Sequence, residues 1–170
     1  NISPFERVIT IEDTMEIRYG AIHPKRDCVM LKVSDQFTYE HAIKASLRQR
    51  LDWILLSEVR GKEVVSLMQC ISAGTKLIST IHAPKASQIP ERMLQIYPNN
   101  YSFNENLRKM IYETIDIGIH LESYHDSKGI HRFIKEIVSF SLNEKNNPIV
   151  SVLYDKQDAS VIDIQKFLEL

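Results

Sequence analysis

A short apolar run between charged residues constrains the fold of this chain more than any other feature. The run Trp53-Ile54-Leu55-Leu56 is followed directly by Ser57-Glu58-Val59-Arg60-Gly61. A continuous apolar run of this length predicts a strand that is buried on both faces, as in a parallel sheet. Glu58 then stands at the carboxyl end of the strand, where open α/β sheets bind ligands and where carboxylates commonly hold a metal ion or the water that attacks a phosphate. The alternative is a solvated glutamate paired with Arg60.

Strands alternate with helices over the first two thirds of the chain. β-branched and apolar residues at 6–13, 28–33 and 77–81 predict three further strands. Apolar residues at helical spacing predict the helices between them, and Thr38 is the expected N-cap of the first helix. This alternation predicts an α/β fold with a mostly parallel sheet and flanking helices. The predicted helices cover residues 39–50, 61–74, 87–97 and 104–114, with Ser87 and Asn104 as caps of the last two.

The pattern changes after Asp116. Apolar residues alternate with polar residues or glycine over 117–122, and Asp126-Ser127-Lys128-Gly129 is a turn sequence. Period-two patterning on both sides of a turn predicts an antiparallel hairpin with one solvated face. We expect this hairpin over 117–140, a third strand at 148–154 and a short helix at 161–170. The sequence therefore predicts a core at 1–115 and, within the same domain, an antiparallel extension at 116–170.

The composition is that of an ordinary globular protein. The net charge is −1 over 170 residues, so no overall positive charge favours nucleic acid. No apolar run reaches the roughly 18 residues of a membrane span. Cys28 and Cys70 are too few for a disulfide framework or a zinc site, so we expect buried thiols in a reducing compartment. Because the chain does not begin with Met, we expect it to be part of a longer protein, called the parent protein below.

Three stretches resemble motifs of the ATPases of type II and type IV secretion systems. Residues 8–17, VITIEDTMEI, resemble the acidic Asp box of that family, and residues 51–61, LDWILLSEVRG, resemble its Walker B strand. Residues 79–83, STIHA, resemble its His box, and the three stand in the family's order. The hairpin that begins at 115–119 is similar to the C-terminal part of the tight-adherence pilus branch. The resemblance covers about residues 1–154 and implies a RecA-like fold.

The resemblance implies catalytic roles for three residues at strand ends. Glu58 matches the Walker B glutamate, which orients the attacking water near Mg²⁺. Glu12 matches an Asp-box acid that completes the site, and His82 matches the His-box histidine near the γ-phosphate. In a parallel sheet the carboxyl ends of the strands lie at one edge, so we expect all three to face a shared cleft. The alternative for Glu58 is a surface salt bridge to Arg60, and the alternative for Glu12 is a place in a solvated acidic turn. The alternative for His82 is a histidine that is hydrogen-bonded to backbone at the strand end.

The resemblance also implies a nucleotide and an assembly. It implies ATP and Mg²⁺ as ligands, and a homo-hexamer at the cytoplasmic face of the membrane. The expected partners are platform proteins of the secretion or pilus machinery, and no nucleic acid is expected. Helix-end arginines usually lie in solvent, which is the alternative to their contacting phosphate. The implied nucleotide-binding residues are Asp13, Glu16, Arg48, Arg50 and Arg60.

This chain departs from the family pattern in several places. It contains no Walker A loop, G-x-x-x-x-G-K-[ST], although the backbone N–H groups and the lysine of that loop supply most of the affinity for triphosphate. We therefore expect residues 1–170 alone to bind ATP poorly or not at all. Ser57 replaces a usual Gly, Leu51 a usual Pro and Thr75 a usual His. Two function classes stay open: an ATP-hydrolysing motor, and a non-enzymatic assembly or partner-binding domain of the same fold.

Three histidines of the hairpin also raise the question of a metal site, since imidazole is a common metal ligand. His120, His125 and His131 lack the cysteine or acid ligands and the tight spacing of a structural zinc site. We expect them to be exposed hairpin histidines.

Overall fold

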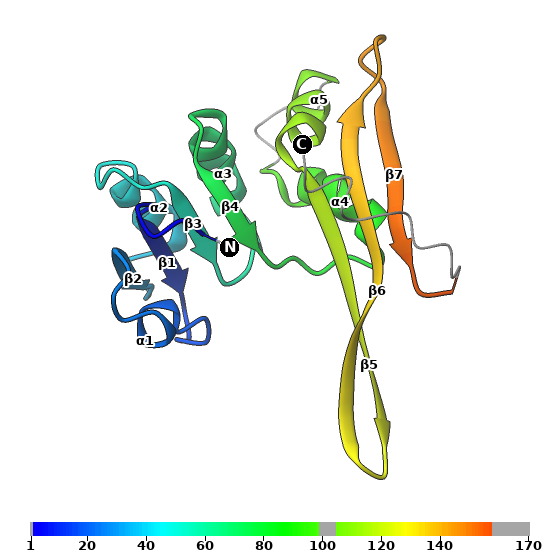
Figure 1. The fold of residues 1–170 in the computed structure, drawn as a ribbon. Helices are drawn as coiled ribbons and strands as arrows, with labels where there is room; N and C mark the ends of the chain where they lie inside the picture. Colours follow the sequence, from blue (N-terminus) through cyan, green and yellow to red (C-terminus); the bar gives the residue numbers. More distant parts are fainter. Residues whose placement is uncertain (1, 99–104, 158–170) are drawn as a thin grey trace. The chain divides into compact units, whose positions relative to one another are not determined.

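The computed structural model describes residues 2–98 and 105–157, so the predicted Asn104 cap and the predicted helix at 161–170 lie outside the described residues. The chain forms two compact units, each with its own sheet (Figure 1). The first comprises the residues up to Ile81 and a short segment from Ile96, and the second comprises His82–Gln95 and the described residues from Glu105 onward. These units do not follow the predicted boundary between residues 115 and 116. Whether they make one domain stays a prediction.

The first unit is built on a parallel sheet of four strands in the order β2-β1-β3-β4. The central strands are the most buried, because β1 lies between two neighbours and β3 consists of apolar side chains. The predicted α/β fold with a parallel sheet is confirmed. The strands are β1 (Val8–Glu12), β2 (Cys28–Lys32), β3 (Trp53–Leu56) and β4 (Lys76–Ser79).

Three helices belong to the first unit: α1 (Tyr19–Ile22), α2 (Tyr39–Ser46) and α3 (Glu63–Ser72). α2 begins at the predicted cap, since Thr38 Oγ1 accepts a hydrogen bond from the His41 N–H at 3.4 Å. α2 ends four residues before the predicted end because the chain turns at 47–50 to reach β3, where Arg50 has a left-handed φ of 53°. α1 was not predicted, because four residues are too few to show a helical period.

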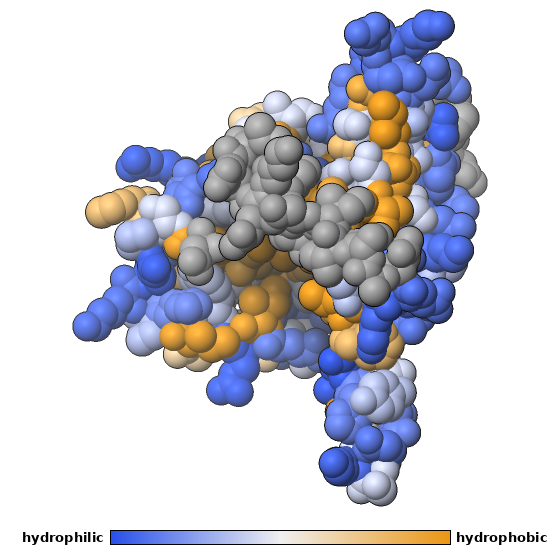
Figure 2. Space-filling model, turned by 45° about the vertical axis from the view of Figure 1, so that its right-hand side comes forward, coloured by the Kyte–Doolittle hydropathy of each residue, from blue (hydrophilic) through white to orange (hydrophobic). Residues whose placement is uncertain are grey.

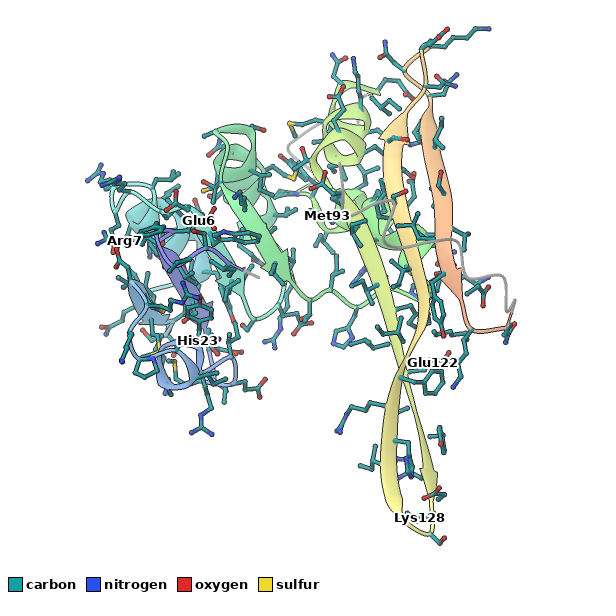
Figure 3. The ribbon with its side chains drawn as sticks, in the orientation of Figure 1. Glu6, Arg7, His23, Met93, Glu122 and Lys128 are labelled. Atoms are coloured by element: carbon teal, nitrogen blue, oxygen red, sulfur yellow. The ribbon has the colours of Figure 1, made fainter. Side chains whose placement is uncertain are left out.

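Residues that precede the strands tie their amino ends together. Arg7, labelled beside Glu6 in Figure 3, lies directly before β1. Its N–H donates to Asp52 Oδ2 at 2.7 Å, and its guanidinium donates to Gln49 O at 2.7 Å and to Asp27 Oδ2 at 2.8 Å. These contacts fix the strand starts in one register, and that register determines where the strands end.

The second unit contains an antiparallel sheet of three strands in the order β5-β6-β7. β5 (Ile117–Asp126) and β6 (Gly129–Leu142) form a long hairpin, and β7 (Pro148–Asp155) pairs only with the part of β6 nearest the helices. The far end of the hairpin therefore projects beyond β7 (Figure 1). This end is mostly hydrophilic, whereas apolar surface gathers along the rest of the sheet (Figure 2). The predicted antiparallel hairpin and third strand are confirmed.

Helices cover one side of this second sheet around a small apolar core. Ser87, predicted as an N-cap, lies instead inside a 3₁₀ turn, because the chain tightens before α4 begins. No helix among the described residues is long and apolar enough to cross a membrane. The helical elements are η1 (Ala86–Gln88), α4 (Ile89–Ile96) and α5 (Glu105–Thr114), and the buried core residues are Ala86, Tyr112, Val138 and Phe140.

Gly118 on β5 provides a test of this packing. A Cβ atom there would lie 2.9 Å from Ile89 Cδ1 and 3.1 Å from both Ala86 O and a ring carbon of Phe140. We expect Gly118→Ala to lower the free energy of unfolding by about 1–3 kcal/mol through overpacking, measured by urea denaturation. Gly61→Ala is the matched control, since its Cβ would meet only one atom, at 3.7 Å. Equal stability of the two variants would contradict the described packing.

Candidate functional site

Two loops that carry the predicted site acids leave neighbouring strands at the same edge of the first sheet. β1 and β3 run parallel with Ile11 opposite Leu56, and the ladder continues to Ser57, whose N–H donates to Ile11 O at 3.0 Å. The loop at 13–17 follows β1, and the loop at 57–62 follows β3. The strand register therefore brings together residues that are far apart in the sequence.

Glu12, the last residue of β1, is fully buried. Its Oε2 atom accepts hydrogen bonds from the N–H groups of Glu16 and Ile17, both at 2.7 Å. Its Oε1 atom is buried and has no hydrogen-bond partner among the described residues. Because the carboxylate accepts two backbone hydrogen bonds, it folds the 13–17 loop back onto the strand end. Glu12 is thus an internal anchor of this loop.

Asp13, Arg60 and Glu58 form a chain of ion pairs at the outer side of this edge. Arg60 Nε donates to Glu58 Oε2 at 2.5 Å, and Arg60 Nη1 donates to Asp13 Oδ2 at 3.0 Å. The side chain of Glu58 is 14% exposed, against 58% for Arg60. The pKa of Asp13 is lowered, first by the hydrogen bond that its carboxylate accepts from the Thr14 N–H at 2.8 Å and then by the charge of Arg60. The hydrogen bond to Glu58 raises the pKa of Arg60. One guanidinium therefore joins the two loops.

Glu63, the first residue of α3, shapes the 57–62 loop. Its Oε1 atom accepts hydrogen bonds from the N–H groups of Arg60 at 2.5 Å and Gly61 at 2.7 Å, and the residue is only 8% exposed. Glu63 was not among the predicted site residues. The available signal was an acid in the first turn of the helix that follows Gly61, where a carboxylate satisfies free backbone N–H groups.

Tyr39, which the sequence places in an apolar helix stripe, also joins the two loops. Its hydroxyl accepts a hydrogen bond from the Asp13 N–H at 3.2 Å and lies 2.8 Å from Ser57 Oγ. Burial raises the pKa of Tyr39, so the hydroxyl keeps its proton at neutral pH. The helical spacing of apolar residues carries no signal for where a ring places its hydroxyl, so sequence reasoning missed this contact.

The remaining predicted residues lie outside this group. Glu16 is exposed on the 13–17 loop. Arg48 and Arg50 precede β3, at the amino edge of the sheet, so the four residues of β3 separate them from Glu58 by roughly 13 Å or more. The structure does not bring these arginines to Glu58, and their role at a subunit boundary stays a prediction. His82 is exposed and belongs to the second unit, so its place relative to Glu58 stays a prediction.

The hairpin histidines show local contacts within the second unit. His131 stacks on Tyr124 with ring centroids 4.8 Å apart, and its Nε2 atom lies 3.0 Å from Asp126 Oδ1. Within residues 2–98 and 105–157, no group of three or more histidine, cysteine or acidic residues is placed to hold a metal ion.

The sequence profile of one known family matches most of this chain. The profile, described as "Type II/IV secretion system protein", covers residues 2–121 and thus both loops of the site. The chain belongs to this family. The predicted family is confirmed, and the likeness to the tight-adherence pilus branch stays a prediction.

The chain is similar in sequence to proteins of several bacteria. VirB11 of Rhizobium radiobacter is 32% identical over 136 residues, which are 74% of this chain and 38% of that protein. Competence protein ComGA of Streptococcus pneumoniae is 32% identical over 94 residues, which are 54% of this chain and 28% of that protein. The chain therefore spans between 28% and 38% of the length of these relatives.

Solved structures share the fold. The VirB11 ATPase of the Brucella suis type IV secretion system, solved with sulphate, matches with a TM-score of 0.68 and 26% identity, over 81% of this chain and 41% of that chain. The pilus retraction motor PilT with bound ADP matches with a TM-score of 0.58 and 18% identity, over 96% of this chain and 44% of that chain. The fold is thus the α/β fold of these ATPases.

The role of Glu12 as an anchor is testable. Glu12→Ala removes the acceptor of two backbone hydrogen bonds, so we expect the free energy of unfolding to fall by about 1–3 kcal/mol. Glu12→Gln keeps an acceptor oxygen and should lose less. Urea denaturation measures both, and amide hydrogen exchange should show faster exchange at Ile17 in Glu12→Ala. Glu16→Ala, an exposed change on the same loop, is the control and should stay within about 0.5 kcal/mol of wild type. Unchanged exchange at Ile17 would contradict the anchor.

Proposed function

We propose that this chain forms the hydrolysis part of an ATP-driven motor for type II or type IV secretion or pilus assembly. The proposal rests on the Asp13–Arg60–Glu58 chain of ion pairs, which joins two loops at the carboxyl edge of a parallel sheet in a member of this family. Ligands of such sheets bind at this edge. A carboxylate held there is positioned to act on the water that attacks a phosphate.

The residues of the edge divide into outer and inner groups. Glu58 starts from a fixed strand end and has the role of the acid that orients the attacking water. On the neighbouring loop, Asp13 is half-buried and Glu16 is exposed, so both are accessible to a bound nucleotide. Glu12 is fully buried and bonded to its own loop. We therefore assign Glu12 a positioning role in place of the catalytic role that the resemblance implies.

The donor set of this edge fits Mg²⁺. Magnesium ions in nucleotide sites are held by one or two carboxylates together with the phosphates, and Glu58 and Asp13 supply carboxylate oxygens linked through one arginine. When bound, the ion neutralises charge that develops on the phosphoryl oxygens. Arg60 pairs with both acids.

The phosphate cradle has to come from elsewhere in the parent protein, because residues 1–170 contain no Walker A loop. β4 is one of the two edge strands of the described sheet, and Ile78 on it is 55% exposed. An apolar cavity of about 320 Å³ lies beside it, lined by Leu55, Ile17 and Tyr19 among others. Parallel sheets are normally covered on both faces, so this surface has room for further chain of the parent protein. Residues 1–170 alone should then bind ATP poorly.

The family membership supports a set of partners for the parent protein. We propose a homo-hexamer that works at the cytoplasmic face of the membrane with platform proteins of a secretion or pilus system, and that binds no nucleic acid. VirB11 of Brucella suis belongs to a type IV secretion system, and PilT is a pilus retraction motor. The second candidate is a non-enzymatic assembly domain of the same fold, which a degenerate phosphate-binding loop in the parent protein would favour.

Replacing Glu58 by glutamine separates these candidates. Glutamine keeps the shape of the side chain but removes the charge that orients the water. In the parent protein we expect Glu58→Gln to lower ATP turnover by a factor on the order of 10²–10⁴ while the affinity for a fluorescent ATP analogue changes little. Glu144→Gln, an exposed change in a turn of the second unit, is the matched control and should keep full turnover. Wild-type turnover in Glu58→Gln would remove Glu58 from the mechanism, and a wild-type parent without turnover would favour the assembly domain.

A further inference from the structure

Tyr39 stands between the two loops of the site although it belongs to neither. It is the first residue of α2, and the Thr38 cap holds the start of that helix in place. A tyrosine hydroxyl has one proton to donate and lone pairs to accept. Here it accepts from the Asp13 N–H at 3.2 Å and shares a hydrogen bond of 2.8 Å with Ser57 Oγ. A single side chain thus contacts the residue after β1 and the residue after β3.

Ser57 is held from three sides. Its N–H donates to Ile11 O at 3.0 Å, its carbonyl accepts from Thr80 Oγ1 at 2.6 Å, and its Oγ atom pairs with the Tyr39 hydroxyl. Glu58 is the next residue, so its backbone leaves from a fixed point. A glycine at position 57 would keep the two backbone bonds but lose the bond to Tyr39. The contact is therefore specific to a chain with serine before the glutamate.

The Arg60 ion pairs are the second connection between the loops, and solvent weakens them more than the Tyr39–Ser57 hydrogen bond. Arg60 joins Asp13 to Glu58, but its side chain is 58% exposed. Solvent screens ion pairs of this kind, and they contribute little to the position of their members. The Tyr39–Ser57 pair is partly buried, and hydrogen bonds that are shielded from water hold their geometry better. The hydroxyl is thus the firmer of the two links.

We propose that Tyr39 is a positioning residue, which holds the Asp13 and Glu58 loops in the arrangement needed for ATP hydrolysis by bonding to the Asp13 amide and to Ser57. This inference rests on the proposed function. Tyr39 acts through its neighbours and does not touch the nucleotide. Its removal should therefore lower the rate of the chemical step more than it weakens nucleotide binding.

A double-mutant cycle in the parent protein tests the link. Tyr39→Phe removes only the hydroxyl, and Ser57→Ala removes only its partner. We expect each to lower kcat by about 5- to 30-fold, with Tyr39→Phe the slower because it also loses the bond from the Asp13 N–H, while KM for ATP changes less than about twofold. Because both remove the same bond, the double variant should be about as slow as the slower single variant. Tyr124→Phe, an exposed tyrosine of the hairpin, is the matched control and should keep its kcat.

Hydrogen exchange separates failure of the link from failure of the proposed function. In Tyr39→Phe we expect the Asp13 amide to exchange about tenfold faster or more, since it loses its acceptor. Multiplicative effects of the two changes on kcat, or wild-type kcat in Tyr39→Phe, would overturn the positioning role. Unchanged exchange at Asp13 would overturn the link itself. If the wild-type parent hydrolyses no ATP, the proposed function and the positioning role both fail, and the exchange data alone decide whether the link exists.

Discussion

The parallel pairing of β1 with β3 is the constraint on which the site depends. With Ile11 opposite Leu56, both strands end at the same level and release their loops at one edge. The pairing is fixed because side chains on both strands are buried, and a slip of one residue would turn each of them to the opposite face. Arg7 reinforces the register at the other edge by bonding to Asp52 and Gln49. The acids of the site are brought together by the apolar core beneath them.

Buried carboxylates support the exposed ones. Glu12 binds the backbone of the 13–17 loop, and Glu63 binds the backbone of the 57–62 loop, so each loop is folded around a carboxylate that is hidden from solvent. The acids that remain near the surface, Asp13 and Glu58, are linked through Arg60 and Tyr39. In a sequence all four acids look alike. Only their burial and hydrogen bonds show which of them shape the loops and which lie nearer the surface.

The sequence predicts the strands well and the contacts between loops poorly. The apolar run at β3 places Glu58 correctly just after a strand end, and period-two patterning predicts the β5–β6 hairpin, because both signals depend on local sequence. The two bonds that Glu12 accepts are local, but its full burial depends on β1 lying between two neighbouring strands, and the reach of Tyr39 to Ser57 depends on tertiary packing; no local pattern contains either. The predicted length of α2 was wrong for a similar reason, since its end is set by the turn that the chain makes to enter β3.

In the function that we propose, nucleotide binds this chain at the carboxyl edge of the first sheet, between the 13–17 and 57–62 loops. A structure of the parent protein with Mg²⁺ and a non-hydrolysable ATP analogue tests it most directly. We expect the γ-phosphate to lie beside Glu58, and Asp13 or Glu58 to reach the ion directly or through water. A triphosphate bound at the opposite edge, near Arg48 and Arg50, with neither loop contacting it, would show that this edge is not the nucleotide site.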